Sequence, residues 1–334
     1  MHGHATRAFE SGFTPGSATR SGSEVLVIGS LNMDLTVHVD VLPAPGATVL
    51  GHGFRTSPGG KGANQAVAAS LAGAPTRILG RVGRDAYGEA LRASLAEGGV
   101  ATEAVIVDSE APTGVALITV EASGQNTIVV APGANGRLSP ADVEAAAGWF
   151  ERAGIVVLQH EVPAETVEKA IAQAAARRLP VLLNPAPARP HPLPRQLLEQ
   201  VTYLVPNETE AAAMTGMNAL ATDEAVREAA RQLAALGPKT VIITLGARGA
   251  FAWLDGQGAW IPAFPITAVD ATAAGDAFVG GLAAELVRGV ELAQALRFAS
   301  ACGALAASRP GAQGSLPRRD EVLQFLSRQG VTYP

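Results

Sequence analysis

The strongest chemical signal in this 334-residue sequence lies at residues 270–278, which read DATAAGDAF. Small residues lead there into an expected helix at 274–288, so that Asp276 falls in the first helical turn. Unpaired backbone N–H groups and the positive end of the helix dipole make such a helix start a binding site for anions. An acidic residue in the first turn also stabilises a helix without any further role. The functional interpretation is that Asp276 is a base, which deprotonates a hydroxyl group in line with a phosphoryl group.

A second signal is the glycine-rich segment at 58–65, which reads PGGKGANQ and precedes an expected helix at 66–71. Its glycines let backbone N–H groups lie close to a ligand, and Lys61 and Asn64 add polar side chains. The segment is not a Walker P-loop, because Lys61 is followed by Gly62 instead of Ser or Thr. No GxGxxG motif follows an expected strand, which disfavours a dinucleotide-binding dehydrogenase. The structural alternative is a glycine turn that begins a helix.

Polar residues also follow two of the expected strands. Asp34 lies beyond a turn at Gly29, and a carboxylate at that position can accept two hydrogen bonds from vicinal hydroxyls. The alternative is that Asp34 is an ordinary turn residue. Asn207 and Glu210 have the spacing of a helix capping box, while the functional alternative puts Glu210 near a hydrated Mg²⁺ ion. The two roles of Glu210 are compatible.

Composition excludes several other classes of protein. With 25 Lys and Arg against 30 Asp and Glu, the net charge of −5 leaves no electrostatic footprint for nucleic acid. No apolar run approaches the ~20 residues that a membrane span needs. His160 adjoins Glu161, but the absence of HExxH or paired-histidine spacing argues against zinc. The single cysteine, Cys302, is expected to be inert core and favours a reducing, cytoplasmic compartment.

The elements that must position these residues alternate along the chain. The expected strands lie at 25–28, 155–158, 181–183, 203–205 and 241–244. The expected helices lie at 141–152, 164–177, 207–215, 224–236, 274–288 and 292–308. Continuous apolar runs of this length are typical of buried parallel strands, and their alternation with helices predicts βαβ units. We therefore expect an α/β fold with a central, mostly parallel sheet flanked by helices.

Two pairs of segments break this alternation. Segments 34–41 and 47–54 are joined by a PAPG turn, and segments 114–120 and 127–131 are joined by an SGQN turn. We expect a small antiparallel sheet that serves as a lid, formed by about 34–54 and 113–131 within a single domain at 24–330. Residues 1–23 lack the apolar core of a secretory signal and are expected to be a disordered leader.

These motifs, together and in this order, resemble the ribokinase family of sugar kinases, also called the PfkB carbohydrate kinases. The resemblance runs from about residue 24 to 325 and rests on segments 29–34, 59–66, 184–188, 206–210, 244–249, 270–278 and 311–315. It implies an α/β sandwich with a β-sheet lid and ATP-dependent phosphorylation of D-ribose at the 5-hydroxyl. It also implies Mg²⁺ bound with ATP, K⁺ or a similar monovalent cation as activator, and a homodimer formed through the lid.

The resemblance also assigns roles to individual residues. The sugar would be held by Asp34, Gly60, Lys61, Asn64 and Glu161, with Asn32 nearby and Asp276 as the base. The transferred phosphoryl group would lie at the backbone amides of Ala273, Ala274 and Gly275. ATP would lie along Asn207, Thr244, Gly246 and Gly249, with Glu210 near the hydrated Mg²⁺. The monovalent cation would lie among Asp270, Thr272, Ala306, Arg309, Gly311 and Ser315, several of them through carbonyl oxygens.

The chain departs from the family pattern at three positions. Ala271 stands where the family often has Thr, Pro310 where other members often have a longer polar residue, and Ser300 where some have a larger polar side chain near adenine. Alternative functions are a related kinase acting on deoxyribose, a nucleoside or another furanose, and a non-catalytic sugar- or nucleotide-binding protein. The second alternative is disfavoured because Asp276 and the glycine-rich segment are both intact.

Overall fold

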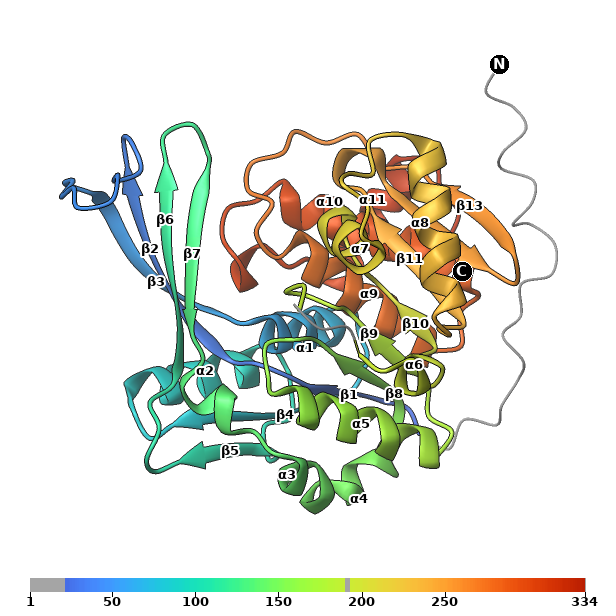
Figure 1. Cartoon of the computed structure of the whole chain (residues 1–334), viewed down its shortest axis with the longest axis horizontal. Helices are drawn as coiled ribbons and strands as arrows, with labels where there is room; N and C mark the ends of the chain where they lie inside the picture. Colours follow the sequence, from blue (N-terminus) through green and yellow to red (C-terminus); the bar gives the residue numbers. More distant parts are fainter. Residues whose placement is uncertain (1–21, 190–192, 334) are drawn as a thin grey trace.

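The computed structural model describes residues 22–189 and 193–333, and Figure 1 shows how the elements are layered. A nine-stranded sheet forms the centre of the body, in the order β13-β12-β11-β10-β9-β8-β1-β4-β5. Its strands are β1 (Glu24–Ile28), β4 (Thr76–Gly83), β5 (Val105–Asp108), β8 (Ala153–Leu158), β9 (Val181–Leu183), β10 (Tyr203–Leu204), β11 (Thr240–Thr244), β12 (Ala250–Leu254) and β13 (Gln257–Ile261). All pairings from β5 to β11 are parallel, and only those of β12 are antiparallel. The expected α/β class is confirmed. Residues 1–21 of the expected leader lie outside the described residues.

Helices cover both faces of this sheet, because successive side chains of a strand point to opposite faces. In β1, Val25 and Val27 belong to one core cluster, whereas Leu26 and Ile28 belong to the other. The first cluster is closed by α1 (Lys61–Leu71), α2 (Ala86–Glu97), α9 (Ala274–Val287), α10 (Leu292–Ala307) and α11 (Arg319–Arg328). The second is closed by α3 (Pro140–Ala145), α4 (Ala147–Phe150), α5 (Ala164–Ala176), α6 (Arg195–Leu198), α7 (Glu208–Thr215) and α8 (Asp223–Ala235).

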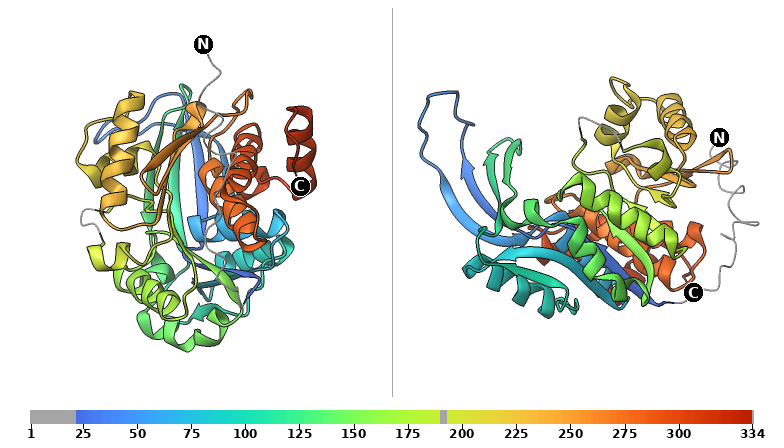
Figure 2. Two further views of the ribbon diagram at one scale, coloured as in Figure 1. Left: turned by 90° about the vertical axis from the view of Figure 1, so that its right-hand side faces the viewer. Right: turned by 60° about the horizontal axis from the view of Figure 1, so that its bottom comes forward.

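A second sheet of four strands projects from the body as a lid (Figures 1 and 2). Its order is β3-β2-β6-β7, and its strands are β2 (Asn32–Val39), β3 (His52–Gly59), β6 (Gly114–Glu121) and β7 (Asn126–Ala131). Each hairpin is antiparallel, but β2 and β6 pair in parallel, so the expectation of a wholly antiparallel sheet is wrong. The reason is topological: β2 follows β1 and β6 follows β5, and these two body strands run in the same direction.

Several boundaries also differ from the sequence prediction. The second lid strand lies at 52–59 instead of 47–54, and the expected helix at 141–152 is divided into α3 and α4. Helix α1 begins at Lys61 instead of residue 66, directly after Gly60 with a left-handed φ of 89°. The glycine-rich segment is therefore partly helical, and Lys61 and Asn64 project from the first turn of α1.

The sequence does not predict β4, β5, β12, β13, α2 or α11. Strand β4 shows why, since it reads TRILGRVG and has no continuous apolar run. Arg77 and Arg81 interrupt the pattern, but both are paired with carboxylates: Arg77 Nε lies 3.5 Å from Glu24, and Arg81 Nε lies 3.2 Å from Asp108. Ion pairing thus allows a charged strand to lie inside the sheet.

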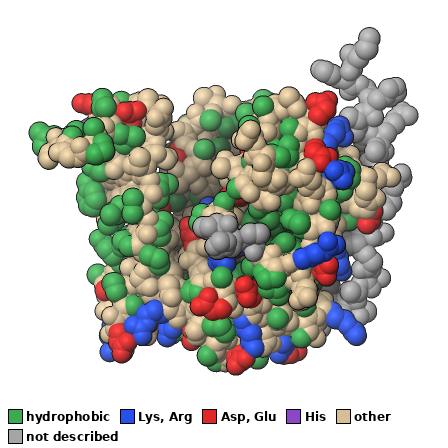
Figure 3. Space-filling view, viewed as in Figure 1, with side chains coloured by type: hydrophobic (Ala, Val, Ile, Leu, Met, Phe, Trp, Pro, Cys, Tyr) green, Lys and Arg blue, Asp and Glu red, His purple; other side chains and the backbone are tan. Residues whose placement is uncertain are grey.

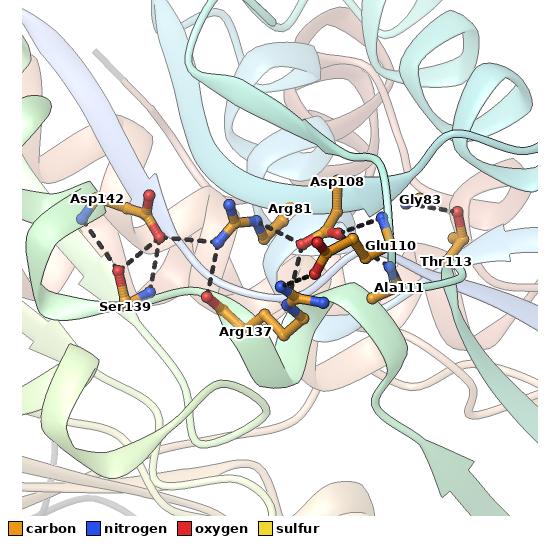
Figure 4. A network of polar contacts seen from close by, with 9 residues as sticks. All are labelled: Arg81, Gly83, Asp108, Glu110, Ala111, Thr113, Arg137, Ser139 and Asp142. Atoms are coloured by element: carbon orange, nitrogen blue, oxygen red, sulfur yellow. Dashed lines mark hydrogen bonds and ion pairs between the residues drawn. The ribbon is translucent and has the colours of Figure 1, made fainter.

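A network of polar contacts holds the base of the lid (Figure 4). Asp108, at the end of β5, accepts hydrogen bonds from the backbone N–H groups of Glu110 and Ala111, both at 2.9 Å. Its other carboxylate oxygen lies 3.2 Å from Arg81 Nε and 3.3 Å from Arg137 Nε. These contacts fix the segment that leads into β6 and therefore the direction in which the lid leaves the body.

Candidate active site

Three parallel strands of the body, β9, β10 and β11, end at one cavity of about 190 Å³, and β8 and β1 lie next to them in the same sheet. Polar residues follow the carboxyl ends of these strands, which is where open α/β sheets bind their ligands. Asp34 follows β1, Glu161 follows β8, Asn184 follows β9, Asn207 follows β10 and Thr244 ends β11. The cavity is lined by Lys61, Asn184, Ala186, Val205, Asn207, Glu210, Thr244, Ala271, Ala273, Gly275, Asp276 and Val279.

Asp276 lies in the first turn of α9 and is only 7% exposed. Asn64 Nδ2 donates to its Oδ2 at 3.0 Å, and Gln65 Nε2 donates to its Oδ1 at 2.9 Å. Both donors come from α1, so the packing of α1 against α9 orients the carboxylate. Asp276 is therefore a carboxylate of fixed orientation that faces a cavity, as a general base requires.

The start of α9 supplies the expected backbone donors in part. Ala273 is the N-cap with a left-handed φ of 59°, and its carbonyl accepts the first helical bond from the N–H of Ala277 at 2.8 Å. The N–H of Ala274 already donates to the carbonyl of Ala271 at 3.2 Å. In the described part of the chain nothing accepts a hydrogen bond from the N–H of Gly275, which is therefore a free donor at the cavity.

Lys61 supplies positive charge to the same cavity. Burial alone would lower the pKa of the Lys61 ammonium, but the carboxylates of Asp276, Glu161 and Glu210 outweigh burial and raise it. Lys61 is therefore a cation held among three carboxylates. Gly60 brings the backbone close to the end of β1, since a Cβ on Gly60 would lie 2.7 Å from the backbone nitrogen of Asn32.

Asp34 lies on the first lid strand, and only 8% of its surface is exposed. Burial, followed by the negative charges of Glu161 and Asp276, raises the pKa of Asp34 to about 7. No side-chain hydrogen bond to Asp34 is found among residues 22–189 and 193–333, so its oxygens are available to a ligand. Nearby, Glu161 accepts hydrogen bonds from Ser30 Oγ at 2.5 Å and from the N–H of Lys61 at 3.0 Å.

The predicted capping box at the start of α7 is confirmed. The N–H of Glu210 donates to Asn207 Oδ1 at 2.8 Å, while the N–H of Asn207 and its Nδ2 donate to the two carboxylate oxygens of Glu210 at 2.8 and 3.0 Å. Burial raises the pKa of Glu210, and the charge of Asp276 adds to that effect. Thr244 pairs with Asn207 through a single β-bridge, so both residues lie on one side of the cavity.

Gly246 begins the 3₁₀ turn that follows β11 (Gly246–Arg248) and Gly249 comes directly after it, both outside the lining of the cavity. Gly249 has a φ of 89°, and a Cβ there would lie 2.1 Å from the carbonyl oxygen of Ile261. The backbone of this turn therefore requires glycine at 249 whether or not a nucleotide is bound.

The two segments expected to hold a monovalent cation lie side by side. Asp270 accepts hydrogen bonds from the N–H of Thr272 and of Gly311, both at 2.9 Å, and the N–H of Asp270 donates to the carbonyl of Ala307. Ala306 and Ser315 are buried next to these segments, with Ser315 Oγ donating to the carbonyl of Ala312. The Arg309 side chain instead pairs with Glu321 at 2.6 Å.

Sequence reasoning assigned no role to the amide residues around Asp276. These residues are Gln65, Gln159 and Asn184. A fourth amide residue, Asn135, orients Asn32 by donating from Nδ2 to Asn32 Oδ1 at 2.8 Å. The only sequence signal was that Gln65 and Asn184 fall in motif segments. Their partners lie about 100 or more residues away, so spacing could not reveal them.

The single cysteine of the chain belongs to the first core cluster. Cys302 is buried, and burial raises the pKa of its thiol, which fits inert core. Within the described ranges, no cluster of three or more His, Cys, Asp or Glu side chains could hold a metal ion. No helix in the described part of the chain is long and apolar enough to cross a membrane.

Comparisons with known proteins agree with this geometry. Residues 23–319 match the pfkB family carbohydrate kinase profile, a range that spans body and lid. The chain is 41% identical over 303 residues to a ribokinase of Bacillus subtilis, covering 91% of this chain and 99% of that protein. It is 36% identical over 304 residues to a deoxyribokinase of Salmonella typhimurium, covering 91% and 99%. The structure of Arabidopsis thaliana ribokinase complexed with ribose and ATP is similar, with a TM-score of 0.83, 33% identity and coverage of 91% and 99%.

Proposed function

The chain belongs to the pfkB family of carbohydrate kinases, and on this premise we propose that it transfers the γ-phosphoryl group of ATP to the 5-hydroxyl of D-ribose. The observation that carries the proposal is the position of Asp276 beside the free N–H of Gly275 at the start of α9, on the wall of the cavity. Phosphoryl transfer needs a positioned hydroxyl and neutralised phosphate charge more than it needs covalent catalysis. This helix start offers both.

Asp276 accepts the proton of the sugar hydroxyl as that oxygen attacks the γ-phosphorus. A positioned base contributes typically 10²- to 10⁴-fold, or about 3–5 kcal/mol. The free N–H of Gly275, with the start of α9 formed by Ala273 and Ala274, donates to the phosphoryl oxygens; one such donor is worth about 3–4 kcal/mol. Lys61 adds a positive charge to the lining of the same cavity.

The sugar hydroxyls are bound by Asp34, Asn32, Asn64 and Glu161, with the backbone of Gly60 and Lys61 close by. Asn64 supports this arrangement, because its Oδ1 is buried and has no hydrogen-bond donor among the described residues. A buried acceptor without a donor is costly, and a sugar hydroxyl would remove that cost. Asn135 turns Asn32 so that its NH₂ group remains free to donate.

ATP would extend from the helix start along Asn207 and Thr244 towards Gly246 and Gly249. Mg²⁺ would be held near Glu210 through water ligands, since both carboxylate oxygens of Glu210 already accept hydrogen bonds from Asn207. When bound, the ion neutralises charge on the phosphates. Asn207 therefore serves first as the group that holds Glu210 in place.

A monovalent cation, K⁺ or one of similar size, would stabilise the loop before α9. Support comes from Asp270, which joins residues 270–272 to Gly311 through its two carboxylate oxygens. The remaining ligands would come from Thr272, Ala306, Arg309, Gly311 and Ser315, several of them through carbonyl oxygens, since hard cations prefer oxygen ligands. Ordering of this loop would in turn fix the N–H groups at the start of α9.

The lid would join two copies of the chain into a homodimer in the cytoplasm. Large apolar side chains on the lid are exposed, and Figure 3 shows them along the projecting arm. They include Leu50 at 94% exposure, Phe54 at 67%, Val129 at 64%, Ile128 at 55% and Leu117 at 51%. An apolar patch of this kind marks an interaction surface. The single, buried cysteine fits a reducing compartment.

A coupled assay for ADP release tests the proposed reaction on D-ribose, 2-deoxy-D-ribose, other furanoses and nucleosides, with ATP, Mg²⁺ and K⁺. The proposal expects the highest kcat/KM with D-ribose and a 5-phosphate product. The similarity to the deoxyribokinase makes 2-deoxy-D-ribose the first alternative substrate. If kcat/KM is highest with 2-deoxy-D-ribose, that sugar replaces D-ribose as the proposed substrate. Sugar binding without ADP release would instead identify a non-catalytic binding protein.

A further inference from the structure

We propose that Gln65 is a positioning residue for Asp276: it holds the carboxylate in the orientation that accepts the proton. The proposal deepens the proposed function and rests on it. Gln65 lies on α1, is 0% exposed, and donates from Nε2 to Asp276 Oδ1 at 2.9 Å. It is not part of the cavity lining, so it would act only through the lining residues that it holds, Asp276 and Asn184.

All hydrogen-bonding atoms of the Gln65 side chain are engaged. Besides Asp276, Nε2 donates to Asn184 Oδ1 at 3.0 Å, and Oε1 accepts from Gln159 Nε2 at 2.7 Å. Rotation of Gln65 would leave buried donors and acceptors unpaired, which typically costs ~1–3 kcal/mol for each group. Gln65 is therefore held in one rotamer, and its donor to Asp276 has a fixed direction.

The neighbours also decide which end of the Gln65 amide faces Asp276. Asn184 Nδ2 donates to the carbonyl of Val205 at 2.8 Å, so Asn184 turns its oxygen towards Gln65. Two acceptors, Asp276 and Asn184, thus face one end of the Gln65 amide, and a donor, Gln159, faces the other. Only the orientation with the NH₂ group towards Asp276 satisfies all of these groups.

The donor matters because Asp276 lies among other charges. Lys61 on α1 is positive, whereas Asp34 on β2, Glu161 after β8 and Glu210 on α7 carry carboxyl groups. A carboxylate in such surroundings can turn towards Lys61 and away from the substrate. Gln65 on one oxygen and Asn64 on the other prevent that rotation.

The first test is Gln65→Met, which keeps the length of the side chain and removes the donor. Misplacement of a catalytic group by about 1 Å can cost 10²-fold, so we expect kcat to fall about 10- to 100-fold. KM for the sugar should stay within about threefold, because Gln65 has no contact with the cavity. The acidic limb of the kcat–pH profile should move to higher pH, since a donor to the ionised carboxylate is lost.

The second test is Gln65→Glu, which is isosteric with glutamine. It keeps the proposal falsifiable if Gln65→Met folds poorly. The ionised new carboxyl group repels Asp276, whereas its protonated form can donate to Asp276 as the amide does. The ratio of variant kcat to wild-type kcat should therefore rise as the pH falls from 8 to 5.5. A purely structural role for Gln65 leaves this ratio independent of pH.

Val67→Ala is the matched control, because Val67 lies on the same helix and is 4% exposed, but its methyl groups face Gly98. This control should lose thermal stability and keep kcat. A Gln65→Met variant with the kcat and pH profile of the wild type overturns the positioning role while leaving the sugar kinase reaction intact. A wild-type enzyme that phosphorylates no sugar of the panel overturns the proposed function itself.

Discussion

Strands β7 and β8 have the same length and a similar content of β-branched residues, yet opposite surroundings. Strand β8 reads AGIVVL and is buried at all six positions, whereas β7 reads NTIVVA and is exposed at all six. The difference lies in topology, since β8 pairs with β1 and β9 in the middle of the body and β7 is the outer strand of the lid. Apolar side chains of the body are used in folding, and those of the lid remain available to a partner.

The largest expected effect comes from placing one charge in each strand. Val157→Asp in β8, at a position 1% exposed, buries an unpaired carboxylate in the first core cluster, on one face of the sheet. We expect a loss above about 4 kcal/mol in the free energy of unfolding, so that little folded protein is recovered. Val129→Asp in β7, at 64% exposure, should change monomer stability by less than about 0.5 kcal/mol and weaken the proposed dimer.

Chemical denaturation measures the first result, and sedimentation of Val129→Asp at several concentrations measures the second. A Val129→Asp variant that unfolds like Val157→Asp would mean that the lid is part of the body's cooperative core. A dimer unchanged in Val129→Asp would remove the lid from the interface.

The next effect concerns Asp276, a body residue for which we propose a chemical role. Asp276→Asn keeps the shape of the side chain and removes the base, so kcat should fall at least ~100-fold while the melting temperature changes little. Steady-state kinetics and a thermal melt check this prediction. Near-wild-type turnover in Asp276→Asn would exclude Asp276 from the mechanism.

Much of the body and part of the site could be predicted from local sequence. Strand β8 is a continuous apolar run, and the Asn207–Glu210 cap and the first-turn Asp276 are set by spacing within one turn of helix. Strand β4 could not be predicted in this way, because Arg77 and Arg81 interrupt its apolar pattern. Their charges are compensated by Glu24 and Asp108, which lie far from them along the chain.

The lid and the amide residues of the site depend on such distant pairings too. The register of β2 against β6 joins segments about 80 residues apart and could not be read from either hairpin. Gln65 and Asp276 are separated by 211 residues, and only the packing of α1 on α9 brings them together. Local patterns thus predict which groups are candidates for chemistry, whereas tertiary packing decides how these groups are oriented.

Asp34 lies where the lid leaves the body, and it should bind sugar without supporting the fold. A site that hydrogen-bonds hydroxyls loses much of its affinity when the partner is removed, so Asp34→Ala should raise KM for the sugar about 100-fold or more. The value of kcat at saturating sugar should change less than KM. Asp34 lies in strand β2, so the alternative of an ordinary turn residue is wrong. An unchanged KM would exclude Asp34 from the sugar contacts and leave them to Asn32, Asn64 and Glu161.

The smallest expected effect is the cost that Asp34 imposes on the fold as the pH rises. Its pKa is about 7 in the folded chain, against 3.8 for an unperturbed aspartate, so the folded state binds the proton more tightly than the unfolded state. Stability from this group is fully present below about pH 4 and is lost as the pH rises through about 7, on the order of 2–4 kcal/mol. Asp34→Asn should abolish that part of the pH dependence, which urea titrations of both proteins between pH 5 and 8 measure.

Measurements with saturating sugar distinguish the contribution of Asp34 to the pH dependence of stability from that of the other carboxyl groups of the site. Sugar hydroxyls that donate to Asp34 stabilise its ionised form, so ligand should flatten the stability–pH curve of the wild type and leave that of Asp34→Asn unchanged. Equal slopes in the two unliganded proteins would assign the pH dependence to Glu210, whose pKa burial also raises. In that case Asp34 would neither stabilise nor destabilise the unliganded fold. Body and lid would then differ only in the burial of their apolar side chains.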